Sequence, residues 1–131
     1  VNTKGLTDLL QIGFSPIFAP ITANDKGQLL NTNADTLAQS IAIGLSSGFD
    51  VDLVYCFEKR GVLKEPTDDT SVFPMINETS YATLKKEGIV TEGMIPKLEN
   101  ALLAISEGVK LVRLCHSDDL NDASQGTQIK A

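Results

Sequence analysis

Residues 34–45 carry a hydrophobic pattern with the period of an α-helix. Their apolar side chains recur at intervals of three and four and so form one stripe: Ala34, Leu37, Ala38, Ile41 and Leu45. Asn31 and Asn33 are both good N-cap residues, and the carboxylate of Asp35 suits the first turn of a helix. The pattern therefore predicts a helix near residues 33–47, with Gly48 as its left-handed stop.

Three further helices follow from similar signals. A helix near 92–107 is indicated by Leu98, Leu102 and Ile105, with Pro96 in its first turn and Gly108 at its end. A short helix between Asn77 and Gly88 and another ending at Gly13 complete the helical segments.

Apolar runs without a helical period predict strands. These runs cover residues 14–19, 51–57 and 109–114, with a short edge strand at 72–73 and a last short strand at 126–129. The turn residues 24–27 predict a hairpin between two short extended segments. Helices and strands alternate, which is typical of an α/β domain with a mostly parallel sheet.

Composition limits the class of protein. At 131 residues, 42% hydrophobic and 21% charged, we expect one globular domain. The formal net charge of −6 argues against nonspecific nucleic-acid binding, which needs a basic surface. We expect no membrane span and no signal segment, and the absence of an initial Met suggests a piece of a longer protein. Cys56 and Cys115 end two strand-like runs and are predicted to be buried free thiols in a reducing compartment, so we expect a cytoplasmic protein.

Two places carry candidate chemistry. Asn31, Asn33 and Asp35 crowd one strand-to-helix turn, where open α/β sheets bind ligands. Lys97 falls near a helix N-terminus, where a cation opposes the helix dipole unless an anion lies between them. The alternatives are a simple helix cap and a solvated lysine. His116 stands alone and is more often structural than catalytic. The sequence has no dinucleotide fingerprint, P-loop, nucleophile elbow or metal-ligand spacing.

Four motifs, in this order, resemble the C-terminal half of the acetylglutamate kinases, within the amino-acid kinase family. They are residues 30–36, residues 54–63, residues 88–90 with 93–100, and residues 126–129. The form of residues 55–61 is similar to the bacteroidete branch, some members of which use N-succinylglutamate. The resemblance covers essentially the whole chain. It implies an open, mostly parallel sheet with helices on both faces. It also implies phosphorylation of the γ-carboxylate of an N-acylated glutamate, in arginine biosynthesis.

The resemblance also implies roles for individual residues. Asn31 would bind the α-carboxylate side of the acylglutamate, Lys97 would stabilise charge on the transferred phosphoryl group, and Asp35 would orient the catalytic lysines. ATP with Mg²⁺ would be the co-substrate, and no metal is expected to be held by the protein itself. The residues expected to line the nucleotide are Glu58, Lys59, Arg60, Gly61, Val62, Leu63, Ile89, Val90 and Thr91. Glu58 departs from the family, which usually has Asp there.

The same resemblance implies a missing N-terminal half. That half would bring a glycine-rich phosphate loop with a second lysine and the arginine that holds the acyl substrate. We therefore expect the 131-residue chain to be inactive alone and the full-length enzyme to be a homo-oligomer. Two alternatives stay open: a nucleotide-binding or regulatory module without catalysis, and another amino-acid kinase that acts on aspartate or on glutamate itself.

Overall fold

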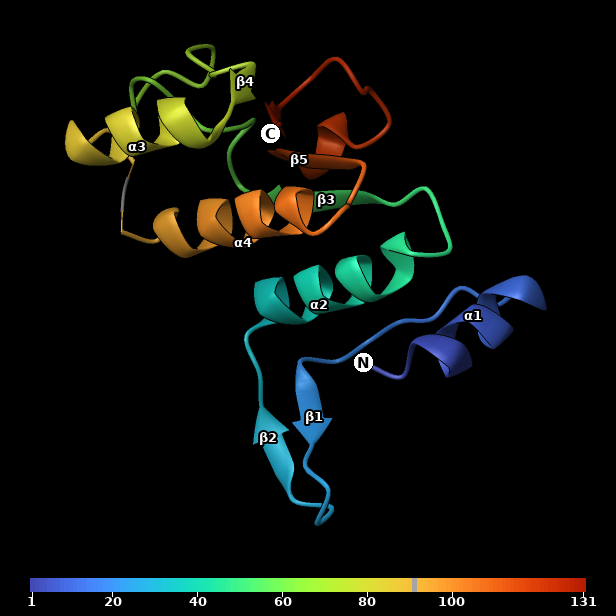
Figure 1. The fold of residues 1–131 in the computed structure, drawn as a ribbon. Helices are drawn as coiled ribbons and strands as arrows, with labels where there is room; N and C mark the ends of the chain where they lie inside the picture. Colours follow the sequence, from blue (N-terminus) through green and yellow to red (C-terminus); the bar gives the residue numbers. More distant parts are fainter. Residues whose placement is uncertain (91) are drawn as a thin grey trace.

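A computed structural model describes residues 1–90 and 92–131. Most of its elements lie where the hydrophobic pattern predicts them (Figure 1). In chain order they are α1 (Thr3–Gln11), β1 (Ile21–Ala23), β2 (Leu29–Asn31), α2 (Ala34–Ser46), β3 (Asp52–Phe57), β4 (Met75–Ile76), α3 (Glu78–Lys86), α4 (Ile95–Ser106), β5 (Leu111–His116), the 3-10 helix η1 (Ser117–Asp119) and β6 (Thr127–Ile129). None of the helices in the described part of the chain is both long and apolar enough to cross a membrane.

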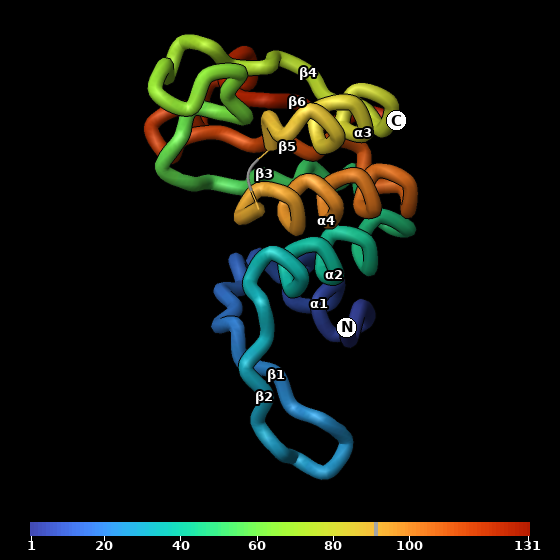
Figure 2. Tube along the Cα trace, turned by 90° about the vertical axis from the view of Figure 1, so that its left-hand side faces the viewer, coloured from blue at the N-terminus to red at the C-terminus, as the bar shows by residue number. Residues whose placement is uncertain are grey.

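The main sheet is open, mixed and mostly parallel, in the order β3-β5-β6-β4. The pairs β3–β5 and β4–β6 are parallel, and β5–β6 is antiparallel. This confirms the predicted α/β class. The segments around the turn 24–27 form the predicted hairpin, β1–β2, which projects away from the main body (Figure 2).

The core lies between one face of the main sheet and the helices. Alternate residues of the strands point to this face, including Tyr55, Leu114 and Ile129, and they pack with side chains from α2, α3 and α4. The opposite face of β5 is covered by the segment 117–126, which contains η1. Within the described residues, the α-helices of the core thus cover one face of the sheet, whereas we expected helices on both.

Helix ends follow local chemistry with one exception. The Asn33 side chain accepts hydrogen bonds from the backbone N–H groups of Asp35 and Thr36, so of the two predicted cap residues, Asn31 and Asn33, it is Asn33 that caps α2. Gly88 and Gly108 end α3 and α4 with φ of +71° and +96°. Gly48 is not left-handed, because α2 closes in a turn in which the Gly48 N–H bonds to the carbonyl of Leu45.

Two predicted strands are wrong. Residues 14–19 form no strand, because none of the described residues lies beside them as a partner, and Ile17 is 98% exposed. Residues 72–73 contribute only a single bridge, between Leu63 and Val72, and the edge strand β4 comes two residues later. Burial of both thiols is also wrong. Cys115 is buried under segment 117–126, but Cys56 is exposed because β3 is the edge strand and the outer face there is open.

Candidate active site

Lys97 and Asp35 form an ion pair between the first turns of α4 and α2. Lys97 Nζ donates to Asp35 Oδ2 at 2.7 Å, and the two side chains are 16% and 30% exposed. Pro96 is the second residue of α4 and has no N–H, and Met94 at the N-cap provides no side-chain hydrogen bond. The start of α4 therefore presents an uncapped helix N-terminus beside a lysine, which is a favourable place for an anion.

The three polar side chains of the turn before α2, Asn31, Asn33 and Asp35, have different contacts. Asn33 caps the helix, so the carboxylate of Asp35 is free to reach Lys97. Asn31 is the last residue of β2 and is exposed. The turn is therefore more than a helix cap, and Lys97 is not a solvated lysine, because it is mostly buried against an acidic partner.

Tyr55 lies beneath this pair and was not predicted from the sequence. Lys97 Nζ sits 5.1 Å from the centre of its ring, and its hydroxyl donates to the backbone carbonyl of Asp35 at 3.1 Å. Burial, with a smaller contribution from the charge of Asp35, raises the pKa of Tyr55 to about 12. Only two sequence signals could have indicated Tyr55 as a site residue. They are its inward position in β3 and the turn that follows this strand.

A pocket of about 180 Å³ reaches the N-terminal end of α4. It is lined by Phe57, Glu58, Lys59, Gly61, Val62, Leu63, Pro66, Ile89, Val90 and Met94. Met94 is also the N-cap of α4, so the pocket and Lys97 meet at the same helix N-terminus. The wall is mostly apolar, which suits a flat ring. The ammonium group of Lys97 lies in the first turn of the helix that begins after Met94, and a cation there suits phosphate.

The pocket brings together the predicted nucleotide residues with two exceptions. The side chain of Arg60 turns to Asp119 instead of lining the pocket, and Thr91 lies outside the described residues. His116 is placed structurally, because its Nδ1 accepts from the backbone N–H of Asp118 at the start of η1.

No set of three metal-ligating side chains gathers in residues 1–90 and 92–131.

Comparison with known proteins shows which family the chain belongs to. The family model described as "Amino acid kinase family" matches residues 1–116. An acetylglutamate kinase from Phocaeicola vulgatus is 48% identical over 130 residues, which are 99% of this chain and 50% of that protein. The chain thus spans about half the length of the curated relatives it matches.

Solved structures agree on the fold. The structure of smu.665 from Streptococcus mutans matches with a TM-score of 0.82 at 30% identity and covers 100% of this chain and 49% of that one. An N-acetylglutamate synthase from Neisseria gonorrhoeae, complexed with coenzyme A and L-arginine, matches with a TM-score of 0.83. Its identity is 20%, over 99% of this chain and 31% of that one, so it supports the fold alone.

Proposed function

Because this chain belongs to the amino acid kinase family and is homologous to acetylglutamate kinases, we propose that it is the nucleotide-binding half of such an enzyme. The reaction would transfer the γ-phosphoryl group of ATP to the γ-carboxylate of an N-acylated glutamate, as a step of arginine biosynthesis. The observation that carries this proposal is the meeting of the pocket, the N-terminus of α4 and the Lys97–Asp35 pair.

Phosphoryl transfer asks mainly for position and positive charge. The attacking group is already a carboxylate, so no base is needed, while charge on the equatorial oxygens of the moving group must be stabilised. Lys97 would supply that charge together with the free N–H groups at the start of α4. Asp35 would act on Lys97 by fixing the direction of its ammonium group through their hydrogen bond, with the Tyr55 ring beneath it.

The pocket would hold the nucleoside end of ATP. Its volume of about 180 Å³ is below the roughly 300–1,000 Å³ of complete ligand pockets, so it would enclose only part of the nucleotide. The phosphates would extend past Met94 towards Lys97, with Mg²⁺ bound chiefly by their oxygens. We propose that residues 58, 59, 61–63, 89 and 90, which line the pocket, contact the nucleotide. Thr91 remains a proposal from the resemblance alone.

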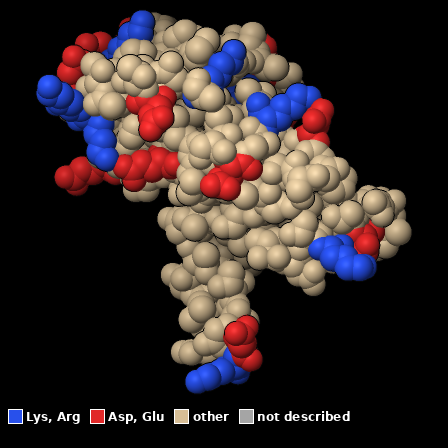
Figure 3. All heavy atoms as spheres, viewed as in Figure 1, with Lys and Arg blue, Asp and Glu red and all other residues tan. Residues whose placement is uncertain are grey.

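The remaining half of the enzyme would complete the acyl-substrate side. Support comes from the half-length match to relatives and from an apolar surface on α1, the hairpin and the segment that joins them. Figure 3 shows few charged side chains over this region apart from α1 and the hairpin tip. The exposed apolar residues there are Leu9, Ile12, Phe14, Ile17, Phe18, Ile21, Leu29 and Leu30. Asn31 stands at the base of this hairpin, where it would bind the α-carboxylate side of the acylglutamate.

Calorimetry on the 131-residue chain tests the proposal. We expect weak binding of MgADP, because part of the phosphate cradle is absent and preorganisation is reduced. We expect no measurable binding of N-acetylglutamate and no kinase turnover. Circular dichroism should first show that the chain is folded. Tight binding of N-acetylglutamate by a folded chain that ignores MgADP would reverse the assignment.

A further inference from the structure

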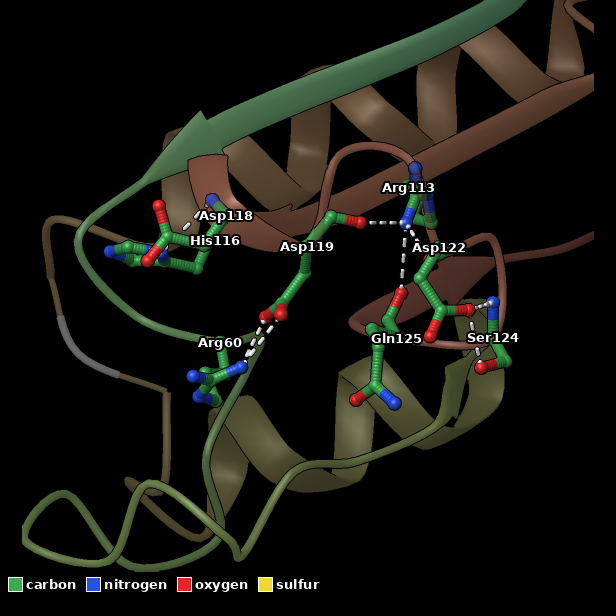
Figure 4. A network of polar contacts seen from close by, with 8 residues as sticks. All are labelled: Arg60, Arg113, His116, Asp118, Asp119, Asp122, Ser124 and Gln125. Carbon is green, nitrogen blue, oxygen red and sulfur yellow. Dashed lines mark hydrogen bonds and ion pairs between the residues drawn. The ribbon is translucent and has the colours of Figure 1, made fainter.

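A buried arginine fastens the segment 117–126 to the outer face of the sheet. Arg113 lies in β5, is 4% exposed, and its guanidinium donates to four backbone carbonyls of this segment. Figure 4 shows Arg113 with Asp119, Asp122 and Gln125, three of the four residues that it contacts. Nη1 reaches the carbonyls of Asp119, Asp122 and Gln125 at 3.2, 2.7 and 3.1 Å, and Nη2 reaches that of Leu120 at 2.7 Å. A loop that would otherwise bury unpaired carbonyls is therefore held in one conformation.

Asp119 connects this anchored segment to the pocket wall, because it contacts both Arg113 and Arg60. While its carbonyl is held by Arg113, its carboxylate accepts from Arg60 Nη1 at 2.6 Å to Oδ1 and 2.9 Å to Oδ2. The Asp119 side chain is only 10% exposed, and Arg60 is half-exposed at 51%. An ion pair with one nearly buried partner is screened less than a surface pair, so its loss costs more. Arg60 stands between Lys59 and Gly61, both of which line the pocket.

Two neighbouring contacts hold the back of the same wall. The backbone N–H of Val62 donates to the fully buried hydroxyl of Thr127 at 2.9 Å. Gly61 packs so closely that a Cβ there would come within 2.6 Å of Val72 Cγ1 and 2.8 Å of Thr127 Oγ1. Residues 60–62 thus make contacts on the side of the wall away from the pocket. Residues 59 and 61–63 line the pocket itself.

We propose that Arg60 is a positioning residue for the nucleotide site. It acts through its ion pair with Asp119 and does not contact the nucleotide itself. The ion pair sets where the wall 58–63 stands against the segment anchored by Arg113. This assignment replaces the direct nucleotide contact that the family resemblance implies for Arg60. It rests on the proposed function, because it requires the pocket to be a nucleotide site.

Nucleotide affinity of paired variants tests this role. In the 131-residue chain, Arg60→Ala and Asp119→Asn should each weaken MgADP binding roughly tenfold, the scale of one interaction worth about 1.4 kcal/mol. The double variant should bind no more weakly than either single variant, because both remove the same ion pair. Arg60→Lys should restore most of the affinity, since an ammonium can still pair with Asp119. Lys4→Ala, which removes an exposed ion pair to Asp8 on α1, is the matched control and should change nothing.

Steady-state kinetics of the complete enzyme separate positioning from general destabilisation. Arg60→Ala should raise the KM for ATP while kcat and the KM for the acylated glutamate stay within about twofold. Arg60→Gln, which keeps a hydrogen-bond donor without the charge, gives the same test should the alanine variant fold poorly. A parallel fall of kcat and both substrate affinities, or unchanged MgADP binding in folded Arg60 variants, would overturn the role of Arg60. Failure of the unsubstituted chain to bind MgADP would instead overturn the proposed function, and this role with it.

Discussion

Lys97 Nζ lies 2.7 Å from Asp35 Oδ2, although 62 residues separate the two along the chain. The contact joins the first turns of α2 and α4, and Tyr55 of β3 closes it from below through its ring and its hydroxyl. Three elements that are far apart in sequence therefore fix the direction of one ammonium group, beside a pocket that shares the α4 N-terminus.

Asp35→Asn should lower kcat in the complete enzyme by about tenfold or more, because Lys97 loses the charge that fixes its position. The fold should survive, since Asn is well suited to the start of a helix. Steady-state kinetics with circular dichroism provide the measurement. Asp50→Asn is the matched control, because Asp50 forms an equally short but exposed pair with Lys110. Equal kcat values for the two variants would remove Asp35 from the catalytic machinery.

Gly61→Ala should weaken MgADP binding to the chain about tenfold, because the new Cβ would push the wall away from Val72 and Thr127. Gly48→Ala serves as the control, since a Cβ there meets nothing within 4 Å and its φ is not positive. Calorimetric titration of the two folded variants gives the comparison. The proposed pocket would be contradicted by a Gly61→Ala chain that binds MgADP as the unsubstituted chain does.

Tyr55 should make the protein less stable at alkaline pH. Its pKa of about 12 in the fold exceeds the value of 10.0 expected on unfolding, so between these values the native state holds a proton that the unfolded state has lost. The contribution of protonated Tyr55 to the free energy of unfolding is therefore complete below pH 10 and is lost as the pH rises through 12. Denaturant unfolding at several pH values should show a steeper alkaline decline for the unsubstituted chain than for Tyr55→Phe. Parallel declines would mean that Tyr55 ionises normally.

The two thiols should differ sharply in reactivity, although they face one another across β3 and β5. Burial raises the pKa of the Cys115 thiol, whereas Cys56 is exposed. Brief treatment of the folded chain with iodoacetamide should modify Cys56 alone, and both residues after denaturation. Mass spectrometry of the peptides reads this out. Modification of Cys115 in the native chain at the rate of Cys56 would show that the segment 117–126 does not cover it.

Local patterns were enough to predict most of the fold. The period of residues 34–45 and the Asn33 cap located α2, and the residues of the turn 24–27 located the hairpin. Lys97 could be placed at a helix N-terminus because Pro96 fits only the first turn. Its pairing with Asp35 follows from the resemblance to acetylglutamate kinases, and residue spacing alone does not reveal it.

Features that depend on distant neighbours could not be predicted in this way. The apolar run 14–19 resembles a strand, but a strand needs a partner beside it. Cys56 ends an apolar run, yet its exposure depends on β3 being the edge strand. Arg60 lies within a pocket motif, and only the position of Asp119 in η1, 59 residues away, explains where its guanidinium points.

The kcat of Lys97→Ala in the complete enzyme is the most direct test of the account. The charge that Lys97 neutralises grows mainly in the transition state, so kcat should fall roughly a hundredfold or more while both KM values change little. Lys110→Ala, which removes an exposed lysine with an equally short ion pair, should retain the kcat of the unsubstituted enzyme. A folded Lys97→Ala enzyme with unchanged kcat would show that Lys97 serves only the packing of α2 against α4.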